Sequence, residues 1–123
     1  MAYIAGIDLG STSLKAVIYD EQGNIVASAS RPTEQHHPSK EHPEWTVWLP
    51  EQIWGGTADA IKDAVAKLDD PGKIRGLAVT GMGMDAVPID EKGDWLYPFI
   101  SWHDPRTVPQ QQWWLKNIGA EKT

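Results

Sequence analysis

The residues best suited to chemistry lie in the run Asp-Leu-Gly-Ser-Thr-Ser-Leu-Lys, residues 8–15. An aspartate ends an apolar segment, and a glycine with three hydroxyl residues forms the turn after it. Backbone N–H groups in such a turn can point at a phosphate, and the hydroxyls supply further donors. The carboxylate can hold Mg²⁺ directly or through water, because hard cations take oxygen ligands. The expected ligands are Asp8 for the metal and Gly10, Ser11, Thr12 and Ser13 for phosphate.

An ordinary hairpin turn is the alternative for this segment, with Asp8 and Gly10 serving turn geometry alone. The segment is not a P-loop, because that pattern has wider glycine spacing, ends in Lys-Ser/Thr and leads into a helix. Here residues 14–19 are apolar and are predicted to form a strand.

A second candidate site is the run Trp-His-Asp-Pro-Arg at residues 102–106. An indole face can cover the C–H groups of a polyol, while a carboxylate and a guanidinium bind its hydroxyls. If the segment is extended, Asp104 and Arg106 point to the same side, because strand side chains alternate. The alternative is a structural Asp–Arg pair at the end of a strand.

The loop at residues 81–85 is a third candidate, since it follows an apolar strand predicted at 74–80. Its glycines permit close approach of a ligand, whereas Met82 and Met84 are residues more often used in packing. Three histidines, His36, His37 and His42, raise the idea of a metal site. They have no partner acids at a recognisable spacing, so a solvated loop is the favoured interpretation.

The elements that must position these residues begin with a meander of three strands, at 3–8, 14–19 and 25–30. Residues 31–45 are rich in Pro, His and Glu and are expected to form a loop. A helix is expected to begin at Pro50, which suits the first turn, and to end at residues 69–72. Its expected buried stripe consists of Ile53, Trp54, Thr57, Ile61, Ala64, Val65 and Leu68.

Two further elements are expected after the strand at 74–80. Residues 86–90 and 95–97 are predicted to form a hairpin around a glycine-bearing turn at 91–94. Thr107 and Gln110 fit a capping box for a last helix that ends near Gly119. Gly55 and Gly56 conflict with the first helix, and close packing of that helix on the sheet is one explanation.

Composition narrows the range of functions. The 123 residues allow one domain, and 41% hydrophobic with 23% charged residues is ordinary for a globular protein. The formal net charge of −6 repels phosphate backbones, so no nucleic-acid partner is expected. Any nucleotide site must then rely on local donors and a metal. The start of the chain lacks the features of a signal peptide and no stretch has the length of a membrane span, so a cytoplasmic protein without membrane contact is expected.

Together these motifs resemble those of the FGGY carbohydrate kinases. That family opens with an aspartate–glycine–hydroxyl phosphate loop and a lysine, matched here by residues 8–13 and by Lys15. Its glutamate–tryptophan region before a helix is similar to residues 43–45 and 50–54. Its substrate loop and its Trp-x-Asp-x-Arg element look like residues 74–85 and 96–107. The similarity spans nearly the whole chain, and residues 74–107 look most like L-fuculokinases.

The resemblance implies an α/β, ribonuclease-H-like domain with a mixed sheet and flanking helices, as in actin and the chaperone ATPases. It also implies ATP and Mg²⁺ as cofactors, phosphate binding by Lys15, and a ketose or polyol substrate. The implied sugar contacts are Gly83, Met84, Asp85, Trp102, Asp104 and Arg106. Many relatives carry a histidine or an Arg–Glu pair near residues 84–85, so the sugar itself is left open.

Family members are several times longer than this chain, so residues 1–123 are expected to be an incomplete N-terminal kinase domain without its C-terminal partner. The catalytic base is expected beyond Thr123, and no catalytic residue is assigned here. The fragment alone is expected to be inactive, and a homodimer is one expected assembly of the full-length protein. Two alternatives stay open: a chaperone-type or structural ATPase of the same superfamily, and a sugar-binding module without enzymatic activity.

Overall fold

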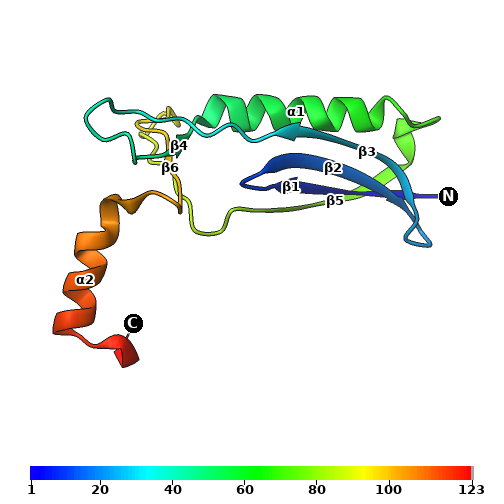
Figure 1. Cartoon of the computed structure of the whole chain (residues 1–123). Coiled ribbons are helices and arrows are strands. Elements are labelled where there is room, and N and C mark those ends of the chain that lie inside the picture. The colour runs from blue at the N-terminus through cyan, green and yellow to red at the C-terminus, as the bar shows by residue number, and fades with distance from the viewer. Residues whose placement is uncertain (123) are drawn as a thin grey trace.

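The computed structural model describes residues 1–122 and is built on a four-stranded mixed sheet with the order β3-β2-β1-β5. β1 (Tyr3–Leu9), β2 (Ser13–Asp20) and β3 (Ile25–Pro32) form an antiparallel meander. β5 (Ile74–Gly81) lies parallel to β1 at the other side of the meander (Figure 1). The three-stranded meander and the fourth strand are therefore confirmed, each within two residues of the expected bounds.

One face of the sheet is covered and the other is open. Along β1, Tyr3, Ala5 and Ile7 are buried, whereas Ile4 and Asp8 are exposed. This alternation follows from the two-residue period of a strand. The long helix α1 (Pro50–Val65) lies along the covered face and packs mainly on β3 and β2 (Figure 1). The open face carries Asp8, so the predicted metal ligand points away from the core.

The helix α1 begins at Pro50, as expected, with Glu51 in its first turn. Its buried positions are Pro50, Ile53, Thr57, Ala60 and Ala64. Trp54 was expected in this stripe but is 73% exposed, because one step along a helix turns the side chain by about 100°. Ala60 is buried but was absent from the expected stripe. Beyond the helix, the Asp70 side chain accepts a hydrogen bond from the Gly72 N–H in the short 3₁₀ helix η1 (Pro71–Lys73).

The paired glycines of α1 have different environments. A Cβ built on Gly56 would lie 2.7 Å from Cδ1 of Leu14, whereas one on Gly55 would meet nothing within 4 Å. Close packing of the helix on the sheet therefore explains Gly56 and leaves Gly55 without a packing reason.

A smaller unit lies at one end of the sheet and contains β4 (Val47–Trp48) paired with β6 (Phe99–Ile100) (Figure 1). Its core joins Trp48 to Leu14 of β2 and Ile53 of α1, so it is fixed to the strand after the predicted phosphate turn. The hairpin expected at 86–97 is wrong as a pair of strands, because only an isolated bridge joins Ile89 and Trp95. Proline lacks a backbone donor, and Pro88 lies within this segment while Pro98 directly follows it.

The last helix, α2 (Val108–Asn117), extends away from the sheet (Figure 1). Gly119 follows it at a φ of 90°, in agreement with the expected end. The capping box is wrong, since Thr107 makes no side-chain cap hydrogen bond. Thr107 ends the 3₁₀ helix η2 (Pro105–Thr107) and keeps helical angles, whereas a capping residue needs an extended backbone. Among the described residues, no helix has the length and apolar character needed to cross a bilayer.

Candidate functional site

The predicted phosphate turn connects β1 to β2 and leaves several donors free. It is closed by the Gly10 N–H, which donates to the Ser13 carbonyl at 3.1 Å. A Cβ on Gly10 would lie 2.9 Å from that carbonyl oxygen and 3.7 Å from the Asp8 carboxylate, so only glycine fits. Within residues 1–122, the N–H groups of Ser11 and Thr12 make no hydrogen bond, and neither do their hydroxyls. These are the donors that a phosphate needs.

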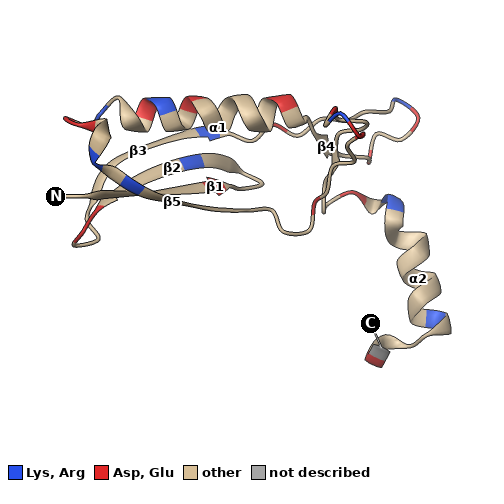
Figure 2. Ribbon diagram, turned by 180° about the vertical axis from the view of Figure 1, so that it is seen from behind, with Lys and Arg blue, Asp and Glu red and all other residues tan. Residues whose placement is uncertain are grey.

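Asp8 and Lys15 face each other across the β1–β2 ladder on the open face of the sheet. Thr80 of β5 is the other neighbour of Asp8, and all three side chains line one cavity of about 340 Å³. Both charges are exposed, and in the described part of the chain neither makes an ion pair. Figure 2 shows that most charged residues lie on α1 and on loops, with few on the strands. An acceptor and a cation are therefore placed together beside the turn.

The groups around this turn suit a metal ion that binds together with the phosphates of a nucleotide. No group of three or more His, Cys, Asp or Glu side chains in residues 1–122 could hold a metal ion. Mg²⁺ usually keeps several waters and takes one or two carboxylates together with the phosphates of its substrate. The single exposed carboxylate of Asp8 beside free N–H groups fits that mode of binding.

A second cavity, of about 350 Å³, joins the phosphate turn to the predicted sugar loop. It is lined by Asp8, Gly10, Ser11, Gly81, Met82, Gly83, Met84 and Trp102. The three candidates from the sequence therefore meet at one place, where the ends of the parallel strands β1 and β5 lie side by side. Trp102 is 58% exposed, and its ring contacts the ring of His103, with centroids 3.6 Å apart.

Asp85 lies on the other side of the same loop, in a cavity of about 360 Å³ with Leu9, Ile53 and Phe99. Both of its carboxylate oxygens are buried, and among the described residues neither has a hydrogen-bond partner. Burial raises the pKa of Asp85, and two nearby groups only partly oppose that effect, namely His103 and the Trp102 backbone N–H, which lies close to the carboxylate without hydrogen-bond geometry. A buried carboxylate without a partner retains acceptor sites for a ligand hydroxyl.

Asp104 and Arg106 do not lie on an extended segment, so the premise of their predicted arrangement is wrong. Asp104 caps the 3₁₀ helix η2, and its Oδ1 accepts from the Arg106 N–H and Nε at 2.9 and 2.8 Å. Its Oδ2 accepts from the Thr46 N–H at 2.7 Å and from Arg106 Nη2 at 2.8 Å. The Asp104 side chain is 0% exposed and that of Arg106 is 16% exposed. Proline at 105 starts the tight turn that the sequence pattern did not reveal.

This buried pair holds the loop that carries Trp102. Burial raises the pKa of Asp104, but the hydrogen bonds from Arg106 and Thr46 outweigh it and lower the pKa overall. The guanidinium of Arg106, whose pKa is raised by its bond to Asp104, stacks over Trp45 at 4.2 Å and donates to the Tyr97 hydroxyl. Four hydrogen-bond donors already occupy the Asp104 carboxylate. Direct contact between Asp104 and a sugar is untested by these bonds and stays a prediction.

Two contributors were missed in the sequence. Thr46 supplies the backbone N–H that holds Asp104, across 58 positions of the chain. Thr33 donates its hydroxyl to the Gly10 carbonyl at 2.7 Å. Neither belongs to a motif, and no local pattern predicts contacts between residues so far apart.

Comparison with known proteins decides the family. Residues 3–123 match the model of the N-terminal domain of the FGGY family of carbohydrate kinases. The chain belongs to the FGGY family of carbohydrate kinases. The identification made from the motifs is therefore confirmed over nearly the whole chain.

Individual relatives agree with this family. A glycerol kinase of Citrifermentans bemidjiense is 38% identical over 123 residues, which cover 98% of this chain and 24% of that protein. The L-fuculokinase of Escherichia coli K12 is 38% identical over 102 residues, which cover 83% of this chain and 21% of that protein. A solved gluconate kinase from Lactobacillus acidophilus has a TM-score of 0.86 at 24% identity, covering 98% of this chain and 24% of that one.

These relatives confirm the expected fold class of FGGY kinases, a mixed sheet with flanking helices. The chain spans about a quarter of the length of the curated relatives it matches. What the whole protein does is therefore a separate question.

Proposed function

We propose that this chain is the N-terminal part of an ATP-dependent kinase that phosphorylates a hydroxyl of a ketose or polyol. The observation that carries the proposal is the cavity shared by Asp8, Gly10, Ser11 and Trp102 with the loop Gly81–Met84. One side of this cavity carries free backbone N–H groups and a carboxylate, and the other side carries an exposed aromatic side chain. Phosphoryl transfer needs these two halves in contact, because positioning and charge neutralisation supply most of its catalysis.

Each residue of the phosphate side has a defined role in this proposal. The N–H groups and hydroxyls of the turn Gly10–Ser13 bind phosphate oxygens of ATP, and Lys15 adds a positive charge on the open face of the sheet. Asp8 holds Mg²⁺ or its water shell at the end of β1. Bound Mg²⁺ supplies neutralisation of the charge that develops on the transferred phosphoryl group.

The sugar side is formed by Gly83, Met84, Asp85 and Trp102. Asp85 accepts hydrogen bonds from sugar hydroxyls, and Trp102 covers a C–H face. Asp104 and Arg106 act mainly by holding the Trp102 loop against Thr46. The catalytic base and most of the adenine site lie beyond Thr123. A cytoplasmic location and a homodimer of the full-length protein belong to the same proposal.

The two alternative functions differ from this one in their ligands. A chaperone-type ATPase of the superfamily has the phosphate turn but needs no sugar contacts, and a sugar-binding module needs no Asp8. The relatives named above are carbohydrate kinases, so they support neither the ATPase nor the sugar-binding module.

A thermal-shift screen of the full-length protein against MgATP and a sugar panel tests the proposal, since a ligand that binds the native state raises the melting temperature. The kinase predicts stabilisation by MgATP and by at least one sugar, followed by sugar-dependent release of ADP. Stabilisation by MgATP without any sugar effect would favour the ATPase, and the reverse pattern would favour the binding module.

A further inference from the structure

Thr33 makes two hydrogen bonds to the predicted phosphate turn from the segment that follows β3. Its side-chain hydroxyl donates to the Gly10 carbonyl at 2.7 Å. Its backbone N–H donates to the Thr12 carbonyl at 3.0 Å. The first of these bonds joins residues 23 positions apart and is partly buried. Thr33 therefore contacts both ends of the turn that carries the free donors.

The bond to the Gly10 carbonyl determines where one free donor of the turn points. The Gly10 carbonyl and the Ser11 N–H belong to one planar trans peptide unit, in which the two groups point in opposite directions. Fixing the Gly10 carbonyl toward Thr33 therefore directs the Ser11 N–H away from Thr33. The only other hydrogen bond that closes the turn within the described residues is the one from the Gly10 N–H to the Ser13 carbonyl.

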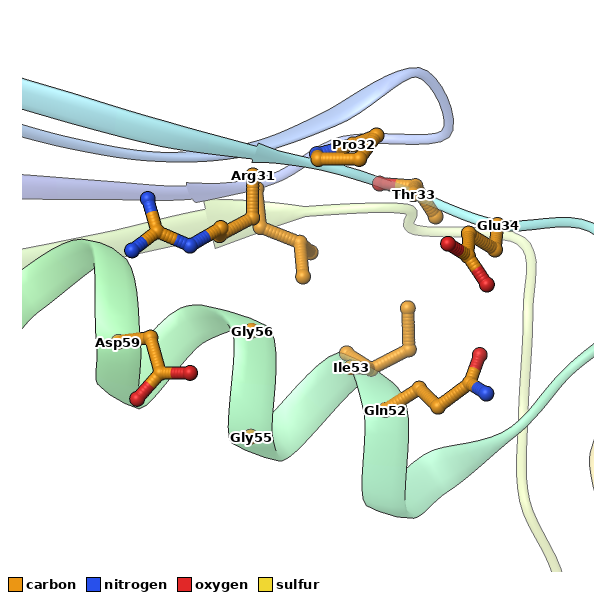
Figure 3. A pocket seen from close by; sticks show the side chains of 10 residues that line it. Arg31, Pro32, Thr33, Glu34, Gln52, Ile53, Gly55, Gly56 and Asp59 are labelled. Atoms are coloured by element: carbon orange, nitrogen blue, oxygen red, sulfur yellow. The ribbon is translucent and has the colours of Figure 1, made fainter.

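Thr33 acts from behind the turn and not from the ligand side. It is one of the residues that line a groove of about 410 Å³ between the end of β3 and α1. Figure 3 shows Thr33 on the segment between Pro32 and Glu34, across the groove from Ile53 and Gln52. The cavity that holds Asp8 and Ser11 has a different lining and does not include Thr33. A residue placed in this way can orient the turn without touching ATP.

We propose that Thr33 is a positioning residue that holds the phosphate-binding turn in the orientation needed for ATP. The inference rests on the proposed function, because it assigns Thr33 to the nucleotide half of that site. It differs from a merely structural role in one respect. A single partly buried hydrogen bond affects stability only modestly, whereas misplacement of phosphate donors affects nucleotide binding and turnover directly.

The test compares Thr33→Val with Thr33→Ser in the full-length protein. Valine keeps the shape of threonine and removes the hydroxyl, and serine keeps the hydroxyl. We expect Thr33→Val to lower kcat/KM for ATP by about tenfold or more, since donor misplacement has effects of this order. Thr33→Ser should restore kcat/KM for ATP to near the wild-type value. Sugar affinity, measured by calorimetry without nucleotide, should be unchanged in both variants.

Thr57→Val is the matched control, because the Thr57 hydroxyl also donates to a backbone carbonyl, that of Ile53, at 2.7 Å. It lies within α1, away from the turn, and should leave kcat/KM for ATP unchanged. Melting temperatures of all variants and calorimetric binding of MgADP separate loss of fold from loss of orientation.

Three results of this experiment would contradict the role of Thr33 or the proposed function on which it rests. If the wild type is active and Thr33→Val has the same kcat/KM for ATP, Thr33 does not position the turn and the proposed function stands. If Thr57→Val loses as much activity as Thr33→Val, the effect comes from stability and the inference is wrong. If the wild type binds no MgADP and turns over no sugar, the proposed function fails first, and the inference fails with it.

Discussion

At the scale of single residues, Asp85 and Asp104 are both buried carboxylates with opposite surroundings. Asp104 accepts four hydrogen bonds, two of them from the guanidinium of Arg106. Asp85 accepts none within residues 1–122. Burying an ionised carboxylate without partners is unfavourable, so the Asp85 side chain reduces stability unless a ligand or a further part of the protein binds it.

We predict that Asp85→Asn raises the stability of the ligand-free full-length protein at pH 7 by about 1 kcal/mol, because it removes a buried charge. The folded pKa of Asp85 lies above its unfolded value of about 3.9. The native state therefore holds the proton more tightly, and wild-type stability falls as the pH rises from the unfolded to the folded pKa. The variant should not show this fall.

Urea denaturation at several pH values measures the Asp85→Asn effect, and calorimetry with the preferred sugar measures the associated change in affinity. A variant that is less stable at pH 7 and binds sugar as tightly as the wild type would show that Asp85 is satisfied elsewhere in the protein.

Asp104→Asn should act in the opposite direction. Loss of one partner from a buried pair typically costs about 3–5 kcal/mol, because the other charge is left unpaired. The folded pKa of Asp104 is lowered, so its stabilisation is present above the unfolded pKa and is lost as the pH falls through the folded pKa. Wild-type stability should therefore fall more steeply than that of the variant below about pH 4.

Denaturation of wild type and Asp104→Asn at pH 7 and at acidic pH checks this, and sugar calorimetry on the folded variant completes the test. A stable variant with a much weaker sugar affinity would instead place Asp104 among the sugar ligands, as the sequence spacing suggested.

The sequence could predict part of this site and not the rest. The turn after β1 is local, so the types and spacing of Asp8 to Ser13 were enough to predict a turn with free hydrogen-bond donors, and phosphate binding by these donors stays a prediction. The environment of Asp104 depends on Thr46, which is 58 positions away, and on the 3₁₀ turn that begins at Pro105. Contacts of that kind are set by the fold and leave no local pattern.

At the scale of elements, α1 contains two adjacent glycines that a sequence pattern treats alike. Gly56 faces Leu14, which is 1% exposed and packs with Trp48 and Ile53 in the smaller core. Gly55 faces open space beside the groove of Figure 3. The helix itself could be predicted from its period and its proline, but which glycine contacts the sheet required the three-dimensional packing.

We predict opposite effects for the two alanine substitutions. Gly55→Ala should raise stability by up to about 1 kcal/mol, because alanine is the better helix former and meets no atom. Gly56→Ala should lower stability, since the new Cβ would lie 2.7 Å from Leu14 Cδ1 and overpacking a core typically costs about 1–3 kcal/mol. Equilibrium denaturation of both variants in the full-length protein measures the difference. Equal stabilities would show that the contact with Leu14 is easily relieved.

At the scale of the whole molecule, residues 1–122 leave apolar surface uncovered. Leu77 and Val79 of β5 lie on the same side of the sheet as α1 but are each 64% exposed, because the helix packs on β3 and β2 instead. β5 also presents an unpaired edge in the described part of the chain. Along α2, Trp113, Trp114 and Leu115 are exposed. Surfaces of this kind are normally covered in a stable protein.

We predict that residues 1–123 alone have no appreciable kinase activity. One phosphate turn without a second domain cannot close over the substrates and exclude water. Coupled release of ADP by the purified fragment with MgATP and a panel of ketoses measures this, with the full-length protein as the control. Turnover on the order of 1–100 s⁻¹ by the fragment, the range typical of kinases, would contradict the prediction.

The central claim is that the turn after β1, with Asp8 at its start, handles the transferred phosphate. Asp8→Asn keeps the shape of the side chain and removes its charge, so sugar-dependent release of ADP by the full-length variant tests the claim most directly. We predict a kcat lower by at least about a hundredfold, with sugar affinity close to that of the wild type. A kcat within about a factor of two of the wild-type value would show that Asp8 is a structural turn residue and would contradict the claim.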